Sequence, residues 1–266
     1  MAITEQVELL GKGLYTDIPH VLTLSSIPTA SELDYVGAED FDATMIESIL
    51  PKAVKEPINF NKLLEIDYHW ICRCLRILNY GPYHTVNTIL CSNCGQASYG
   101  EFRVDLQAID CKPLPEGFVN DLVISKDEFI DFNGDIHLKL PTIQAMLNAK
   151  ADTAFQSADG KNKNSDLSRM CYMITSIKGN TALTPIDKKM IIQNELSAAD
   201  YIILKERVSE LTNYGLRLGG ATMCPKCQSP KATFMTFIDD RFFRPTLGDL
   251  TAWRDDKRKR TSKNKA

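Results

Sequence analysis

Two Cys-x-x-Cys pairs, Cys91 with Cys94 and Cys224 with Cys227, constrain the fold of this 266-residue chain more than any other feature. Each pair lies between two short stretches that are typical of β-strands, HTVNTIL and YGEFRVDL around the first and GLRLGGAT and ATFMTFI around the second. This pattern predicts two β-hairpins, each with two cysteines at its tip. Two residues between cysteines let both thiolates of a pair reach one tetrahedral metal at about 2.3 Å. The two pairs together predict a Cys₄ zinc ribbon with a structural Zn²⁺.

The two pairs are separated by about 130 residues, against roughly 15–20 in a compact ribbon. We interpret the intervening region as an insertion that splits the ribbon into two halves. A metal would then close a long loop, the case in which a cross-link stabilises a fold most. Two alternatives stay open: a degenerate ribbon without metal, and redox-active disulfides. A redox Cys-x-x-Cys of the thioredoxin type opens a helix, whereas both pairs here are expected between strands.

The N-terminal sequence lacks the apolar stretch of a signal peptide, and no run reaches the roughly 18 apolar residues of a membrane helix. We therefore expect a protein that is made and kept in a cytosol, without membrane contact. In a reducing compartment, paired cysteines are more often metal ligands than disulfides. Cys74 and Cys171 lie on apolar helix faces and are expected to pack as small hydrophobic side chains.

The alternation of helical and strand patterns predicts an α+β fold, with N-terminal helices packed on a split β-hairpin zinc ribbon that carries a largely helical insertion. The clearest helix runs from Ile66 to a stop at Gly81. Asn133-Gly134 predicts a type I′ hairpin, and helices are expected over Leu167–Ile177, after Thr184 and after Ser197. The expected segments are an N-terminal arm (1–37), helices and the first ribbon hairpin (38–112), the mostly helical insertion (113–214), the second hairpin and closing segment (215–253) and a basic tail (254–266).

Charge is unevenly distributed along the chain. Residues 254–266 hold seven Lys/Arg and two Asp/Glu, a balance of +5, so the formal net charge of −3 leaves −8 for the rest. A dedicated nucleic-acid-binding domain is usually basic over its body, so nucleic acid is not an expected partner. The tail is expected to be a disordered, solubilising end that could order against an acidic partner.

The Phe-rich segment before the tail allows two interpretations. Strand alternation is expected to bury Phe234 and Phe237, whereas the following Phe242-Phe243-Arg244-Pro245 stretch could be core or a docking surface. No Gly-rich phosphate loop, G-x-S-x-G or H-E-x-x-H motif occurs in the sequence. A Cys₄ site offers a metal no open coordination position. We therefore expect no enzymatic activity.

One resemblance is carried by the order of these motifs. A helix ends in Leu75-Arg76-Ile77-Leu78-Asn79-Tyr80-Gly81, a strand leads to Cys91 and Cys94, and a Val104-Asp105-Leu106 strand follows; CPKCQ and FFRP come late in the chain. Over residues 40–110, and less closely over 215–247, the chain resembles the baseplate hub protein family of T-even-type bacteriophages.

The resemblance implies a structural or assembly component of a bacteriophage tail baseplate, assembled in the host cytoplasm and located in the virion. The implied partners are other baseplate hub and tail-tube proteins, with multiple copies in a symmetric assembly and no catalysis. The alternative from the motifs alone is a zinc-ribbon protein that binds nucleic acid or acts in transcription.

Overall fold

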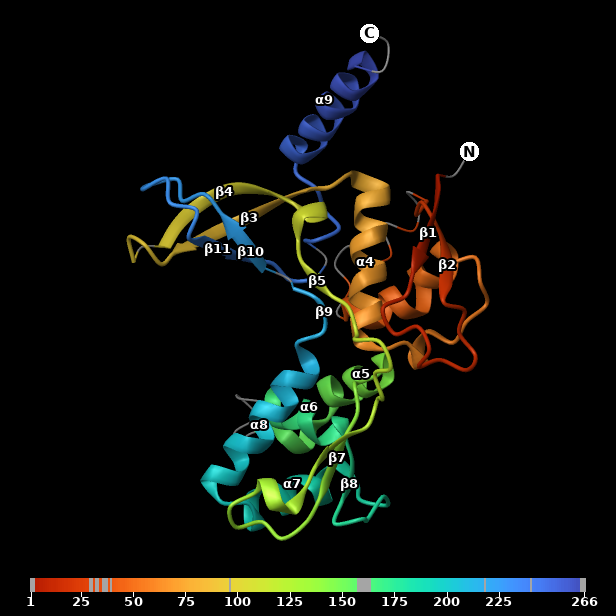
Figure 1. Ribbon diagram of the computed structural model, residues 1–266. Coiled ribbons are helices and arrows are strands. Elements are labelled where there is room, and N and C mark those ends of the chain that lie inside the picture. Colours follow the sequence, from red (N-terminus) through yellow and green to blue (C-terminus); the bar gives the residue numbers. More distant parts are fainter. Residues whose placement is uncertain are drawn as a thin grey trace.

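The computed structural model shows an α+β protein, as the sequence predicts, in which two hydrophobic cores meet at one long helix, α4 (Glu65–Tyr80) (Figure 1). Among the described residues, no helix is both long and apolar enough to cross a lipid bilayer. The structure describes residues 3–28, 31, 34, 38, 40–95, 97–156, 164–217, 219–239 and 241–263.

The N-terminal segment is a folded part of the first core. Strands β1 (Thr4–Glu8) and β2 (Val21–Ser25) form an antiparallel hairpin in which Val7 faces Leu22. Val7, Leu22 and Leu24 are buried, and both strands contact α4. The carboxylate of Asp67 on α4 accepts hydrogen bonds from the backbone N–H groups of Leu10, at 2.6 Å, and Gly11, at 3.2 Å. In its described part, the N-terminal arm expected over residues 1–37 thus contains a hairpin that packs on the first core.

Short helices lead from this hairpin to α4. Asp40 caps the first of them, and three consecutive helical pieces open the region in which helices are expected from residue 38 onwards. Helix α4 spans the predicted residues and ends at Gly81, whose φ of +82° suits glycine. The pieces before α4 are α2 (Phe41–Thr44), a π-helical turn (Met45–Ile49), α3 (Leu50–Ala53) and a 3₁₀ turn (Phe60–Lys62).

Both hairpins expected around the cysteine pairs are present, and they join into one antiparallel sheet of order β10-β11-β3-β4. The first hairpin is β3 (Tyr83–Cys91) with β4 (Ala97–Asp105), and the second is β10 (Gly219–Thr222) with β11 (Ala232–Met235). Strand β11 pairs with β3, and Ala232 faces Cys91. Two segments far apart in sequence therefore form neighbouring strands. A short antiparallel strand pair, β5 (Cys111–Lys112) with β9 (Gly215–Leu216), holds together the two points where the chain enters and leaves the insertion.

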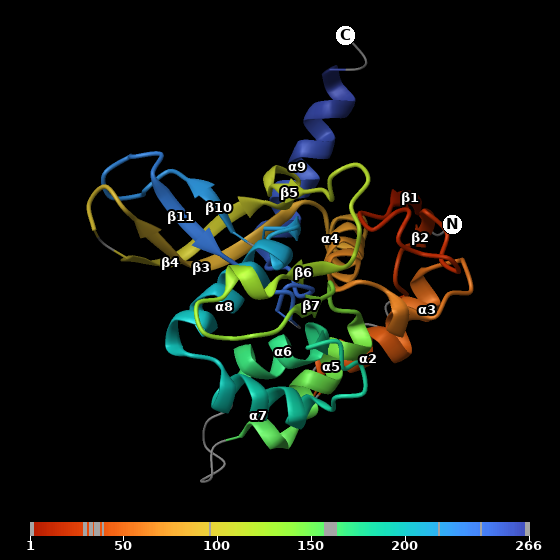
Figure 2. The same ribbon diagram turned by 60° about the horizontal axis from the view of Figure 1, so that its bottom comes forward.

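The insertion has its own hydrophobic core, which includes Leu64 and Ile66 at the start of α4. Helices pack against a three-stranded sheet of order β6-β7-β8 (Figure 2). The 3₁₀ turns in and around the insertion are Leu106–Ala108, Lys126–Glu128 and Thr153–Phe155. The main elements are β6 (Leu122–Ile124), β7 (Ile136–Leu138), α5 (Ile143–Ala151), α6 (Ser165–Met173), β8 (Ile174–Ile177), α7 (Pro185–Glu195) and α8 (Ala198–Thr212).

The hairpin predicted at Asn133-Gly134 is wrong, because β7 pairs with β6 and β8 and neither turn residue has a positive φ angle. The reason is the buried Asp200 at the start of α8. Its carboxylate accepts hydrogen bonds from the backbone N–H groups of Ile130, at 2.6 Å, and Phe132, at 3.1 Å. These donors hold the loop, and together with the Ser197 hydroxyl they lower the pKa of Asp200 even though burial acts to raise it.

The three predicted helices of the insertion begin as expected, with side-chain caps from Thr184 and Ser197 on α7 and α8. The first is shorter than predicted: α6 ends at Met173, and Ile174–Ile177 form β8 instead. β-branched residues favour the strand there, and pairing with β7 buries Ile174 and Ile177. The polar loop expected over residues 156–165 falls mostly on residues 157–163, outside the described part of the chain.

The closing segment belongs to the first core. Phe242 and Phe243 are both 1% exposed and belong to the core, whereas Arg244 is exposed and Pro245 is partly exposed. Phe234 is buried as expected, but Phe237 is 62% exposed, because residues three apart on an extended chain point to opposite faces. The prediction of a disordered tail is wrong for residues 254–263, because they continue helix α9 (Leu247–Lys263).

Arg76 joins three parts of the first core. Its side chain is fully buried, and its guanidinium donates hydrogen bonds to the carbonyls of Gly81 at 2.9 Å, Tyr83 at 2.7 Å and Phe242 at 2.7 Å. The guanidinium of Arg76 therefore links helix α4, the start of β3 and the closing segment through hydrogen bonds. Buried carbonyls that lose such a donor cost about 1–3 kcal/mol each.

We expect Arg76→Met to lower the free energy of unfolding by at least about 3 kcal/mol, because three buried carbonyls lose their donor. Urea denaturation followed by circular dichroism measures the change. Arg254→Met, on an exposed arginine of α9, is the matched control and should shift the value by less than about 0.5 kcal/mol. One ordinary hydrogen bond contributes about 1 kcal/mol. If Arg76→Met lowered the free energy of unfolding by less than about 1 kcal/mol, the proposed role of Arg76 would be contradicted.

Candidate metal centre

The pairing of β3 with β11 brings the two cysteine pairs together. Cys91 is the last residue of β3, and Cys94 lies in the turn that leads to β4. Cys224 and Cys227 lie in the turn between β10 and β11. Because β11 runs antiparallel to β3, its first residue lies beside the last residue of β3, so both turns lie at the same end of the sheet.

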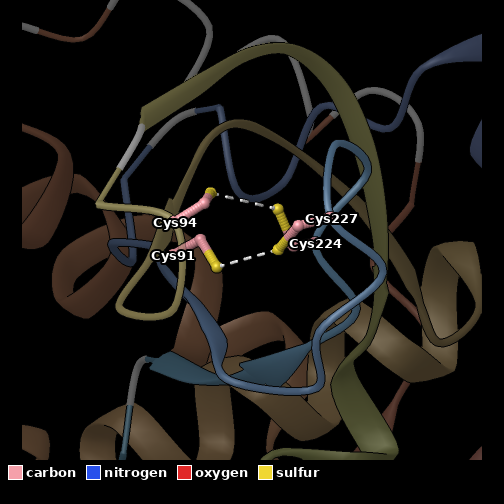
Figure 3. Close-up of side chains that lie close together, drawn as sticks. All are labelled: Cys91, Cys94, Cys224 and Cys227. Carbon is pink, nitrogen blue, oxygen red and sulfur yellow. Dashed lines mark hydrogen bonds between the residues drawn. The ribbon is translucent and has the colours of Figure 1, made fainter.

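The four sulfur atoms form one compact group. All of them lie within 4.8 Å of one another, with Cys91 Sγ to Cys227 Sγ at 3.6 Å and Cys94 Sγ to Cys224 Sγ at 4.0 Å (Figure 3). A tetrahedral metal with bonds of about 2.3 Å separates its sulfur ligands by roughly 3.8 Å. A disulfide needs about 2.05 Å, and all four cysteines are free thiols. The spacing of the four sulfurs is therefore compatible with binding one metal ion.

Backbone and side-chain hydrogen bonds fix the two turns. The Cys224 N–H donates to the carbonyl of Ser229 at 2.8 Å, and the Ser92 hydroxyl joins the two turns by donating to the Lys231 carbonyl at 3.1 Å. The Ser229 N–H and the Asn93 amide donate to the Cys227 sulfur and lower the pKa of that thiol to about 6. Cys227 thus favours the thiolate, the form that binds a metal.

The two turns share one backbone feature. The residue after the second cysteine has a left-handed conformation in each turn, with φ of +65° at Gly95 and +56° at Gln228. Glycine adopts this conformation without steric cost, whereas a side chain costs about 1–2 kcal/mol. The left-handed conformation of Gln228 therefore costs the second turn conformational free energy, which glycine spares the first turn.

The other cysteines and histidines do not join the cluster. Burial raises the pKa of Cys74 to about 12 and that of Cys171 also to about 12, as fits their expected packing role. His84, which lies on the same strand as Cys91, sits near the other end of β3 and shares a hydrogen bond of 2.9 Å with the Thr236 hydroxyl. Burial, together with the charge of Arg76, lowers the pKa of His84 to about 4. Among the described residues, only the four predicted cysteines gather as candidate metal ligands.

A groove of about 690 Å³ lies on the outer face of the same sheet. Sequence reasoning did not predict it, because it forms only where β3 and β11 pair and the segment after β11 folds along them. Its apolar lining comes from exposed side chains of the two ribbon halves, and Arg241, Arg244 and Thr246 line its rim. The exposed apolar residues of the lining are Leu90, Met235 and Phe237, which are 55%, 67% and 62% exposed, and the buried Val86 and Phe234 line it as well.

We expect Gln228→Gly to raise the free energy of unfolding by about 1 kcal/mol, because glycine removes the strain of the left-handed conformation. Chemical denaturation in one buffer measures the change. Gln107→Gly, at an exposed position whose φ is not left-handed, is the control and should lower stability by about 0.5–1 kcal/mol. An unchanged or lower value for Gln228→Gly would show that the second turn carries no such strain.

Comparisons of the chain with protein-family models, curated proteins and solved structures found no match.

Proposed function

We propose that Cys91, Cys94, Cys224 and Cys227 bind one structural Zn²⁺, and that the protein is an assembly component of a bacteriophage tail baseplate hub. The observation that carries the metal assignment is the group of four sulfurs within 4.8 Å. Thiolates at tetrahedral spacing favour Zn²⁺ over hard cations such as Mg²⁺ and Ca²⁺, which take oxygen ligands.

The donor set supports a structural role for the metal. Four cysteines fill the tetrahedron of a zinc ion and leave no position for water or substrate. The ion would join the end of β3 to the start of β11, and so connect residues 91–94 with residues 224–227 across the insertion. We therefore propose that the metal stabilises the split ribbon and that the protein acts through contacts with other proteins.

The baseplate assignment rests on the sequence resemblance, and the outer groove of the ribbon supplies a surface suited to it. Leu90, Met235 and Phe237 expose large apolar side chains in the lining of this groove. Exposed apolar surface of this kind, with a polar rim, is typical of protein–protein contact sites. We propose that hub or tail-tube proteins pack on this face.

The proposal is tested by deleting the gene from the genome that encodes the chain and supplying variants from a plasmid. Without the gene, electron microscopy of lysates should show contractile-tail particles that lack complete baseplates. Phe237→Asp should fail to restore complete particles, because a buried carboxylate weakens an apolar interface. Ile202→Asp is the matched control, since Ile202 is 58% exposed on α8, away from the groove.

Complete baseplates in the deletion strain would overturn the baseplate role. If Phe237→Asp and Ile202→Asp restored complete particles equally well, the baseplate role would stand, but the groove would be rejected as the contact surface.

A further inference from the structure

Strand β3 has a strand partner on only one side over most of its length. On that side it pairs with β4 almost from end to end, whereas on the other side β11 pairs only with residues 89–91. After Phe234 the chain leaves the register with β3, and in the described chain no backbone hydrogen bond joins residues 236–238 to β3. The middle of β3 therefore has a free edge inside the sheet.

Two residues of β3 direct their backbone groups to this free edge. Across the β3–β4 pair, the Leu106 N–H donates a hydrogen bond to the Pro82 carbonyl at 2.7 Å. The backbone groups of successive strand residues point to alternate sides, so those of Thr85 and Asn87 point away from β4. They offer two donors and two acceptors to a further strand.

The outer groove of the ribbon lies along this edge. Residues 84–88 of β3 line one part of it, and residues 233–237 of the diverging segment line another. The buried side chains of His84 and Thr236 join these two parts by a hydrogen bond of 2.9 Å, which gives the groove a floor. Five strand residues span about 16 Å, and the groove volume of about 690 Å³ lies in the range of roughly 300–1,000 Å³ found for binding sites. A short extended segment therefore fits beside the edge.

The free edge favours an extended chain over a helix as the ligand. A helix bonds its own backbone N–H and C=O groups internally, so it would leave the groups of Thr85 and Asn87 without partners. An extended segment bonds to such groups when it adds to a sheet edge. Its alternate side chains would then face the floor and the exposed Met235 and Phe237.

The charges of the lining favour an uncharged segment. Asp239 is paired with Arg241 at 2.9 Å, and Asp249 is paired with Arg103 at 3.5 Å. The two remaining charged groups of the lining have opposite signs. The groove thus has no strong net charge that would select an acidic or a basic ligand.

We propose that the groove binds an extended, uncharged segment of another protein, which adds to β3 as a strand at Thr85 and Asn87. Every strand of the described chain already pairs with another strand of the same chain, so a second copy would have to release one to occupy the groove. The inference rests on the function proposed above and specifies how the partner is held on this face.

The test uses the purified full chain and a fluorescein-labelled peptide of three valines alternating with three serines, between a terminal lysine and a terminal glutamate. Neighbouring amides of a bound strand point to opposite edges, so either the valine or the serine amides bond to β3. N-methylation of one set should weaken binding at least about tenfold in fluorescence anisotropy, and N-methylation of the other set less than about threefold. Equal effects of both sets, or no binding of the unmodified peptide at about 1 mM, would overturn the inference.

Asn87→Pro tests the same contact from the side of the protein. Proline removes the Asn87 N–H and is tolerated where that group has no partner in the sheet. The variant should bind the peptide at least about tenfold more weakly, and Asn87→Ala, which keeps the N–H, should bind within about twofold of the wild type. Equal losses in the two variants would reject the backbone contact. Should Asn87→Pro fail to fold by circular dichroism, the two methylated peptides decide with the wild-type chain.

Complementation of the deletion strain separates this inference from the function on which it rests. Asn87→Pro should fail to restore complete baseplates, as Phe237→Asp should. If Asn87→Pro restored them and Phe237→Asp did not, the groove would contact a partner without an added strand, and this inference alone would be rejected. If the deletion strain had complete baseplates while the methylated peptides differed as expected, the baseplate role would be rejected and the strand site would stand. Dimers of the purified chain that Asn87→Pro dissociates would assign the edge to a second copy and overturn the choice of partner.

Discussion

Four cysteine sulfurs lie within 4.8 Å of one another, although they come from two parts of the chain that are about 130 residues apart. They meet because β11 pairs with β3, which joins the two hairpins into one sheet. Only three residue pairs form the register between those strands, from Ala232 with Cys91 to Phe234 with Ile89. So short a pairing is weak on its own, and a metal bound at its end would supply what the strands lack.

Helix α4 carries the rest of the architecture. Its first turn contributes Ile66 to the core of the insertion, and its later turns contribute Ile71 and Leu75 to the core under the ribbon. Arg76 on the same helix bonds to the carbonyls of Gly81, Tyr83 and Phe242. The insertion is thus a second folded unit that packs on the same helix as the first core. The two cysteine hairpins keep their contact with that core although the insertion separates them in the sequence.

Local signals in the sequence predicted the elements whose structure is decided locally. The spacing of Cys91, Cys94, Cys224 and Cys227 identified both turns of the site, and the caps at Thr184 and Ser197 marked where two helices begin. Predictions failed where a distant partner decides the outcome. The carboxylate of Asp200, about 70 residues away, accepts hydrogen bonds from the backbone N–H groups of the loop around Asn133. Pairing with β7 places Ile174 in a strand instead of in the preceding helix.

The same distinction applies at the two ends of the chain. The N-terminal segment is held in place because the Asp67 carboxylate on α4 accepts hydrogen bonds from its backbone. The start of the C-terminal helix is held because Trp253 lies against Gly81 and Asp256 accepts a hydrogen bond from Tyr83. Neither partner can be identified from the terminal sequences alone. The outer groove belongs to this class as well, since residues from both ribbon halves line it only after they meet.

The most direct test of the central claim is the metal content of the purified chain, measured by native mass spectrometry together with elemental analysis. The account predicts one zinc ion per chain, lost in Cys224→Ser and retained in Cys111→Ser, a thiol outside the cluster. A folded wild-type protein without metal, or one whose mass shows disulfides in place of bound zinc, would contradict it.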